Sequence, residues 1–193
     1  MINNTNKITI GLSLLLLSSC ADISKDNIQN QETEDKHEKI EPNKEGIIIN
    51  FLETINEAEA NIAKTLVDKL NNPEAKSFAR FMIEEHTKNL NETKKISDDN
   101  KIAPVETDKV KNLRAEIEKE LDKLKSLSGD ALDKAYIDAM VKGHEDVLEE
   151  IDNFLKENNI LALQKHLEAT RHHVIHHLEL AQKIQKELQS KKL

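Results

Sequence analysis

Residues 66–82, LVDKLNNPEAKSFARFM, contain the turn around which the fold of this chain is organised. Asn71-Asn72-Pro73 interrupts a helical pattern of apolar residues, and Asn72 is a good N-cap for a helix that has Pro73 in its first position. Such a short joint makes the two flanking helices antiparallel neighbours. We therefore predict one helix over about residues 46–70 and a second from Pro73 to about residue 97.

A second helical hairpin is predicted in the C-terminal half, over about residues 130–156 and from the turn at Asn158-Asn159 to about residue 190. Between the hairpins, a polar loop containing Pro104 leads to a charged helix over about residues 108–127, which ends at Ser128-Gly129. Two tight hairpins joined by a long connection predict an all-α, ferritin-like four-helix bundle with a long helical crossover. The connecting helix could instead be a fifth packed member of the bundle.

The composition agrees with an all-helical chain, because Trp is absent and Gly and Pro number only 4 and 3 in 193 residues. No alternating apolar and polar run is long enough for a strand. Residues 45–193 have the size of one domain with one substantial core.

The N-terminus resembles a bacterial lipoprotein signal. The apolar run Ile8 to Leu17 would reach only about 15 Å as a helix, too short to span a bilayer, and it ends in Leu17-Ser18-Ser19-Cys20, which resembles a lipobox. We expect residues 1–19 to be a cleaved signal peptide and Cys20 to carry the lipid; the alternative is a free reduced cysteine. The protein would then be an envelope lipoprotein that faces the periplasm or the cell exterior and contacts the membrane only through its lipid.

Residues 20–44 are rich in Asp, Glu, Lys, Asn and Gln and are predicted to form a disordered tether. Loss of the single lysine in residues 1–19 would shift the formal net charge from -8 to -9. Because no block of Lys and Arg forms a basic face, nucleic acid is not expected as a partner.

Each long predicted helix places a polar residue in its apolar stripe. Glu59 lies between Ile55 and Ile62, and His86 follows Met82 at helical spacing. The third long helix contributes His144. On the last helix, one face carries His166, Thr170, His173 and His177, and the last two of these form an i, i+4 pair. The His172 and His176 pair is expected to be exposed on a neighbouring face.

Counting residues from the turns places these polar groups at one level. Glu59 and His86 lie thirteen residues before and fourteen residues after Asn72. His144 and His173 each lie about fourteen residues from Asn158-Asn159, and His177 lies one turn farther. One plane across the bundle could therefore collect a carboxylate and three imidazoles, which a divalent ion would satisfy. The alternatives are a hydrogen-bonded core network without metal, or exposure of some of these groups.

Several short motifs resemble the bacterial domain-of-unknown-function family 4142, whose members are ferritin-like and often exported. The motifs are Ala58-Glu59, Asn72-Pro73-Glu74 with Phe78-Ala79, Met82 before Glu85-His86, Ser128-Gly129 with Ala135-Tyr136, Met140-Val141 with His144, and His177-Leu178-Glu179-Leu180-Ala181. The resemblance implies Glu59, His86, His144 and His177 as the site and favours His177 over His173. The chain departs from the family pattern at Arg171-His172, where the family usually carries Leu-Pro.

The function predicted from these residues is binding of a single divalent ion, Zn, Cu or Fe, with catalysis less expected than binding. A di-iron centre is not expected, since the one Glu-x-x-His motif, Glu34 to His37, falls in the tether. The main alternative is a non-catalytic envelope interaction or stress module that binds a periplasmic protein partner and no metal. A third hypothesis, an oxidase or peroxide-handling enzyme, is the least favoured.

Overall fold

The computed structural model describes residues 43–157 and 160–190, which form five helices and contain no strand. These helices are α1 (Lys44–Leu66), α2 (Pro73–Asn100), α3 (Asp108–Lys125), α4 (Gly129–Glu157) and α5 (Leu161–Ser190). The prediction of an all-α fold is confirmed for the described residues, and the helix bounds differ from the predicted ones by a few residues. The predicted signal peptide, Cys20 and almost all of the tether lie outside the described residues.

The first hairpin forms at the predicted turn, although α1 ends at Leu66, four residues earlier than expected. The Asn72 side chain caps α2, since its Oδ1 accepts hydrogen bonds from the backbone N–H groups of Glu74 and Ala75. The turn is also tied to α4, because the buried carboxylate of Asp133 accepts from the N–H groups of Asn71 at 2.9 Å and Asn72 at 2.8 Å. These two bonds satisfy N–H groups that a continuing helix would have used itself.

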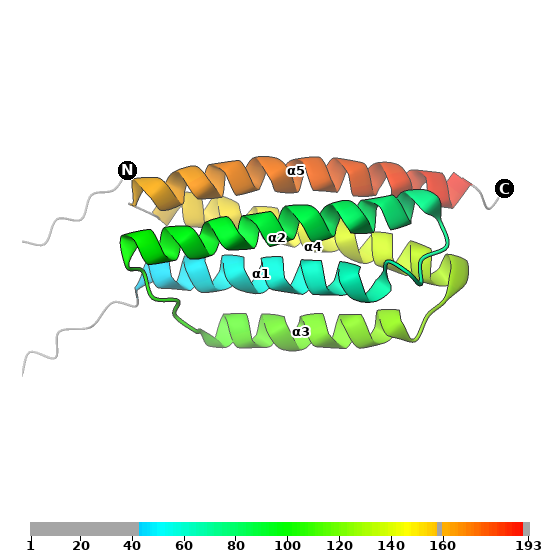
Figure 1. Ribbon diagram of the computed structural model, residues 1–193, viewed down its shortest axis with the longest axis horizontal. Helices are drawn as coiled ribbons and strands as arrows, with labels where there is room; N and C mark the ends of the chain where they lie inside the picture. The colour runs from blue at the N-terminus through cyan, green and yellow to red at the C-terminus, as the bar shows by residue number, and fades with distance from the viewer. Residues whose placement is uncertain (1–42, 158–159, 191–193) are drawn as a thin grey trace, which may run out of the picture. The chain divides into compact units, whose positions relative to one another are not determined.

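The four long helices lie side by side, and α3 runs along the outside of the bundle (Figure 1). Helix α1 packs on α2, α4 packs on α5, and α2 also contacts α5. Helix α3 packs mainly along α1 and more sparsely on α4, so the connecting segment is a packed fifth helix. None of the helices in the described part of the chain combines the length and apolar composition needed to cross a membrane.

The loop between α2 and α3, residues 101–107, packs against the start of α1. The backbone N–H of Val105 donates to the carbonyl oxygen of Gly46 at 2.9 Å. A Cβ atom at Gly46 would lie 2.4 Å from the carbonyl oxygen of Ala103, so this close approach requires glycine.

Two apolar clusters fill the bundle, one on each side of a layer of polar side chains. One cluster contains Ile62, Met82, Met140 and Ala181, and the other contains Ile55, Val147 and Val174. In the sequences of α1, α4 and α5, Glu59, His144 and His177 fall between residues of the two clusters. The polar layer is therefore enclosed above and below by apolar core, which raises the cost of leaving its atoms without partners.

Candidate metal centre

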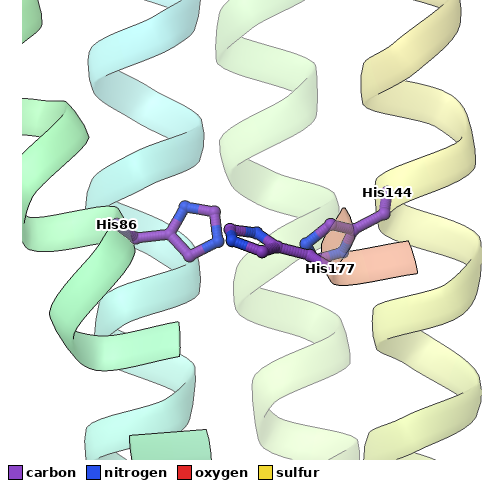
Figure 2. Close-up of side chains that lie close together, drawn as sticks. All are labelled: His86, His144 and His177. Atoms are coloured by element: carbon purple, nitrogen blue, oxygen red, sulfur yellow. The ribbon is translucent and has the colours of Figure 1, made fainter. Parts of the chain in front are cut away.

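Four polar side chains from four helices meet inside the bundle. They are Glu59 of α1, His86 of α2, His144 of α4 and His177 of α5, with exposed fractions of 7%, 4%, 1% and 3%. Figure 2 shows the three imidazole rings turned toward one another from separate helices. The structure thus brings together the four residues that the family motifs had indicated, whereas counting from the turns had placed His173 rather than His177 at this level.

The distances between these groups are short. The ligand atoms of the three imidazoles lie within 4.8 Å of one another, and the ring centroids are 5.2 to 5.9 Å apart. Oε2 of Glu59 lies 2.8 Å from Nε2 of His86 and 3.4 Å from Nε2 of His144. One carboxylate oxygen therefore borders two imidazoles at once.

Hydrogen bonds on the far side of two rings fix which nitrogen faces the centre. Nδ1 of His144 is 2.8 Å from the carbonyl oxygen of Met140, which can only accept, so His144 carries its proton on Nδ1. Nδ1 of His86 is 2.9 Å from Oδ1 of Asn56. It must donate as well, because the Asn56 amide nitrogen donates to the carbonyl of Leu52 and identifies Oδ1 as the acceptor. In the neutral rings, both Nε2 lone pairs then point toward Glu59.

The inward atoms of this centre have no hydrogen-bond partner among the described residues: Oε2 of Glu59, Nε2 of His86, Nε2 of His144 and Nδ1 of His177. The short contact of Glu59 with His86 is not aligned as a hydrogen bond. Lone pairs and a carboxylate that converge in an apolar surrounding repel one another unless a cation lies between them. That cation is either a proton on an imidazole or a metal ion.

The electrostatics favour the deprotonated forms of Glu59 and His177. Burial alone would raise the pKa of Glu59, but the positive charge of His144 and His86 in their protonated forms outweighs it and lowers this pKa from 4.5 to about 2. Burial, assisted by the neighbouring His86 and His144, lowers the pKa of His177 from 6.5 to about 3. An ionised carboxylate and a neutral imidazole are the forms that bind metal.

The spacing suits a small divalent ion. Tetrahedral bonds of 2.0–2.1 Å separate ligand atoms by about 3.3 Å. The two distances from Glu59 already bracket this value, at 2.8 and 3.4 Å. The imidazole nitrogens, within 4.8 Å of one another, reach it if the rings shift by about 1 Å. The residues present therefore fit a four-coordinate ion of the zinc type.

The other predicted histidines lie elsewhere. His173 is half-buried and outside the cluster, because residues four apart on a helix are separated by about 6 Å along the axis and only one can be level with the centre. His166 is buried, but its Nε2 pairs with Oγ1 of Thr93 at 2.8 Å. His172 and His176 are exposed, as expected. Helix α5 is continuous through Arg171, which pairs with Asp152 of α4 at 2.6 Å, and His177 keeps its inward position without the family's Leu-Pro.

Two asparagines behind the centre were not predicted. Asn56 orients His86, and Asn89 donates to Oδ1 of Asn56 at 3.2 Å while accepting from the Thr170 hydroxyl at 3.2 Å. Both asparagines were detectable in principle. Asn56 precedes Glu59 by three residues and Asn89 follows His86 by three, which places each on the inward face of its helix.

Tyr136 is a further polar group near the centre. It is completely buried and stacks edge-on against Phe78, with ring centroids 6.4 Å apart. Burial and the charge of Glu59 raise the pKa of its hydroxyl, which has no hydrogen-bond partner among the described residues. Tyr136 therefore stays protonated, and its hydroxyl is a hydrogen-bond donor in the protein interior.

Comparison with known proteins gives one finding. The model of the family described as Domain of unknown function (DUF4142) matches residues 30–184, which include all five helices up to Ile184 and all four side chains of the centre. Neither a curated protein nor a solved structure matches the chain.

Proposed function

Because this chain belongs to the family described as Domain of unknown function (DUF4142), whose description assigns no activity, we propose its function from the buried centre. We propose that the helical domain binds one divalent metal ion through Glu59, His86, His144 and His177. The observation that carries the proposal is the convergence of buried, unpartnered imidazole nitrogens from three helices, with Oε2 of Glu59 at 2.8 and 3.4 Å from two of them.

The second layer of contacts supports metal rather than a metal-free polar core. A core stabilised by hydrogen bonds alone would pair its inward nitrogens and oxygens, whereas here the outward nitrogens of His86 and His144 are bonded and the inward ones are not. Outer-layer bonds that fix the tautomer of each imidazole are characteristic of histidine metal ligands.

The donor set favours a single ion of zinc, copper or iron. Di-iron centres in helical bundles use carboxylates from several helices, and this centre contains the single carboxylate of Glu59. Three imidazoles and one carboxylate complete a tetrahedral shell, which leaves zinc no open position and favours a binding or carrier role over catalysis.

We further propose that the bundle is of the ferritin-like type, with α3 as its crossover, and that Cys20 anchors it as a lipoprotein of the cell envelope. The hairpin pairing of α1 with α2 and of α4 with α5 supports the first proposal. The lipobox-like residues 17–20 support the second, and a periplasmic protein is then the expected class of partner.

The metal content of the purified protein tests the central proposal. After incubation with Zn²⁺ and removal of the excess, elemental analysis should find about one ion per chain in the wild type. His86→Ala and His144→Ala should each abolish retention, because each removes a ligand from a closed shell. His172→Ala removes an exposed imidazole from the same protein and should retain the wild-type content.

Circular dichroism of each variant establishes that its helices are intact. A folded wild type that retains no Zn²⁺, Cu²⁺ or Fe²⁺ overturns the proposal and leaves an interaction module as the function. Retention that persists in both His86→Ala and His144→Ala also overturns it, since the ion would then lie elsewhere.

A further inference from the structure

A cleft of about 680 Å³ lies between α3 and the surface formed by α1 and α4. Its walls are largely apolar and come from all three helices: Ile55, Ile62, Ile117, Leu124, Met140 and Val147. Helix α3 thus covers this space while remaining packed on α1.

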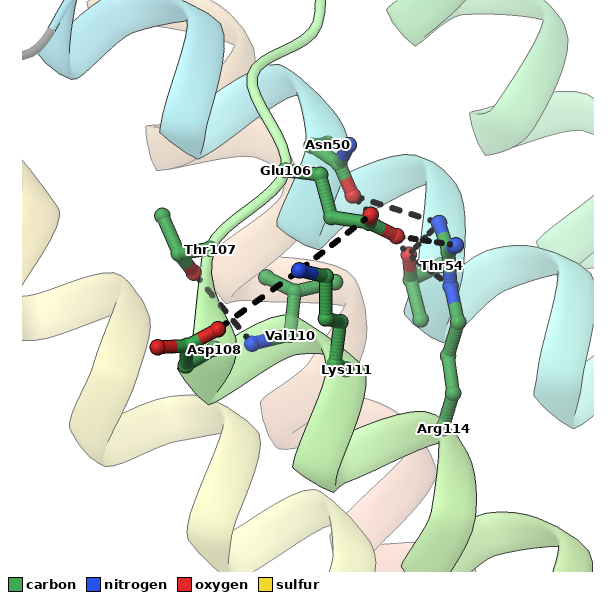
Figure 3. A network of polar contacts seen from close by, with 8 residues as sticks. All are labelled: Asn50, Thr54, Glu106, Thr107, Asp108, Val110, Lys111 and Arg114. Carbon is green, nitrogen blue, oxygen red and sulfur yellow. Dashed lines mark hydrogen bonds and ion pairs between the residues drawn. The ribbon is translucent and has the colours of Figure 1, made fainter.

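Helix α3 is fastened to α1 near one end of the cleft. The guanidinium of Arg114 donates to Oγ1 of Thr54 at 2.9 Å and to Oδ1 of Asn50 at 3.2 Å (Figure 3). Nη1 of Arg114 pairs with Oε1 of Glu106 at 3.1 Å. On the α4 side, Lys109 pairs with Glu150 at 2.5 Å. These contacts hold the N-terminal half of α3 in place above the cleft.

Glu59 lies at the inner end of the cleft. Glu59 belongs to the cleft lining and, at the same time, its carboxylate contacts His86 and His144 in the buried centre. Its Oε2 is buried and has no hydrogen-bond partner among the described residues. One side chain thus connects the cleft with the imidazole site.

The lining of the cleft is acidic. Besides Glu59 it contains five acidic residues and two lysines, and both lysines are paired with acids, Lys109 with Glu150 and Lys142 with Asp146. Acidic residues around a low-dielectric cleft concentrate cations at its entrance. Glu116 of α3 and Glu149 of α4 are exposed members of this set.

Gly143 keeps the cleft wide beside the site. It precedes His144 in the middle of α4, where glycine is unfavourable for a helix. A Cβ atom at this position would meet no heavy atom within 4 Å, so close packing does not account for the glycine. A larger side chain here would project into the cleft instead of into the core.

The opposite side of the centre is nearly closed. The cavity there, which Glu85 and His173 help to line, has a volume of about 10 Å³, roughly the space of one water molecule. A divalent ion with six waters needs about 180 Å³. Of these two cavities, only the one beneath α3 admits a hydrated ion.

We propose that the cleft beneath α3 is the path by which a hydrated divalent cation enters the buried centre, with Glu59 as the first ligand to replace its water. The proposal rests on the proposed function, since it describes how the same centre is loaded. The acidic lining attracts the ion, and the carboxylate stays bound while the three imidazoles replace the remaining waters.

Rapid mixing of the full-length protein with Co²⁺, followed by visible absorption, tests the path. Gly143→Leu should slow association by about tenfold or more and slow dissociation by the same factor, leaving the affinity unchanged, because an obstructed path raises the barrier in both directions. Glu145→Leu introduces the same side chain at an exposed position of α4 outside the cleft and should bind at the wild-type rate.

A second pair of variants tests the charge of the entrance without altering the core. Glu116→Gln combined with Glu149→Gln should slow association several-fold at low ionic strength and weaken its dependence on salt. Glu118→Gln combined with Glu145→Gln removes two exposed acids from the same helices outside the cleft and should bind at the wild-type rate.

The outcomes separate the path from the proposed function. Wild-type rates in Gly143→Leu, or equal rates in the two double variants, overturn the path while metal binding stands. A change in affinity without matching changes in both rates also overturns it, because the substitution would then act on the site itself. Absence of Co²⁺ binding by the folded wild type overturns both proposals.

Discussion

Oδ1 of Asn56 and Nδ1 of His86 lie 2.9 Å apart across the α1–α2 interface, and this hydrogen bond turns Nε2 of His86 toward the buried centre. Asn56 is 1% exposed and is itself held by Leu52 and Asn89. The orientation of one candidate ligand is thus fixed by a neighbouring helix.

Asn56→Ala is expected to weaken metal affinity by about 10- to 100-fold, since loss of an outer-layer partner frees the ring and its tautomer. It should also destabilise the fold by about 1–3 kcal/mol, because the Asn89 amide loses its acceptor. Competition with a chromophoric chelator measures the affinity. Asn56→Asp keeps an acceptor for His86 and should retain more of the affinity; equal losses in the two variants would contradict this role.

The metal-free protein should lose stability as the pH is lowered from about 7 to about 5. The pKa of His177 is about 3 in the folded chain and 6.5 ordinarily. Between these pH values the unfolded chain binds a proton that the folded chain excludes. The free energy of unfolding therefore decreases as the pH is lowered, by at most about 1.4 kcal/mol per pH unit. Glu59 adds a loss in the same direction, between its ordinary pKa of 4.5 and its folded value of about 2.

Denaturant unfolding in the presence of a chelator measures this dependence. His177→Leu should reduce the slope by up to one proton, whereas His172→Leu, at an exposed position of α5, should leave it unchanged. An unaltered slope in His177→Leu would show that its imidazole is not excluded from protonation in the folded state.

Tyr136→Phe is expected to leave the stability of the metal-free protein unchanged or to raise it by about 1 kcal/mol. The hydroxyl is buried without a partner among the described residues, so its removal relieves a desolvation cost, while the edge-on contact with Phe78 is preserved. Thermal unfolding measures the effect. Tyr136→Leu, which also removes the ring contact, is the control and should destabilise; a clear loss in Tyr136→Phe would indicate that the hydroxyl has a partner in solution.

Asp133→Ala should destabilise the fold by about 2–3 kcal/mol, because the carboxylate accepts from two backbone N–H groups of the α1–α2 turn. Asp130→Ala removes an exposed carboxylate from the first turn of the same helix and should cost well under half as much. Urea unfolding of both variants gives the comparison. Equal effects would mean that the tie between α4 and the turn contributes little.

Periodicity and turn chemistry in the sequence were sufficient to predict the helices. Asn72 and Pro73 start α2 where expected, and apolar spacing identified the inward faces that carry Glu59, His86 and His144. Both signals are local, since a cap or a stripe involves residues within a few turns of one another. The tie between the α1–α2 turn and Asp133 was not predictable in this way, because Asp133 is about sixty residues away in the sequence.

The sequence by itself indicated which residue types face inward, since the inward stripe follows from 3.6 residues per turn. Counting residues from the turns did not fix the depth in the last helix, because it placed His173 and not His177 level with the other groups. Only the tertiary structure decided that Asn56, held by Asn89, orients the candidate ligand His86, and that a cleft remains beneath α3. Those outcomes depend on the relative rotation and separation of whole helices, which side chains far apart in the sequence fix when they pack.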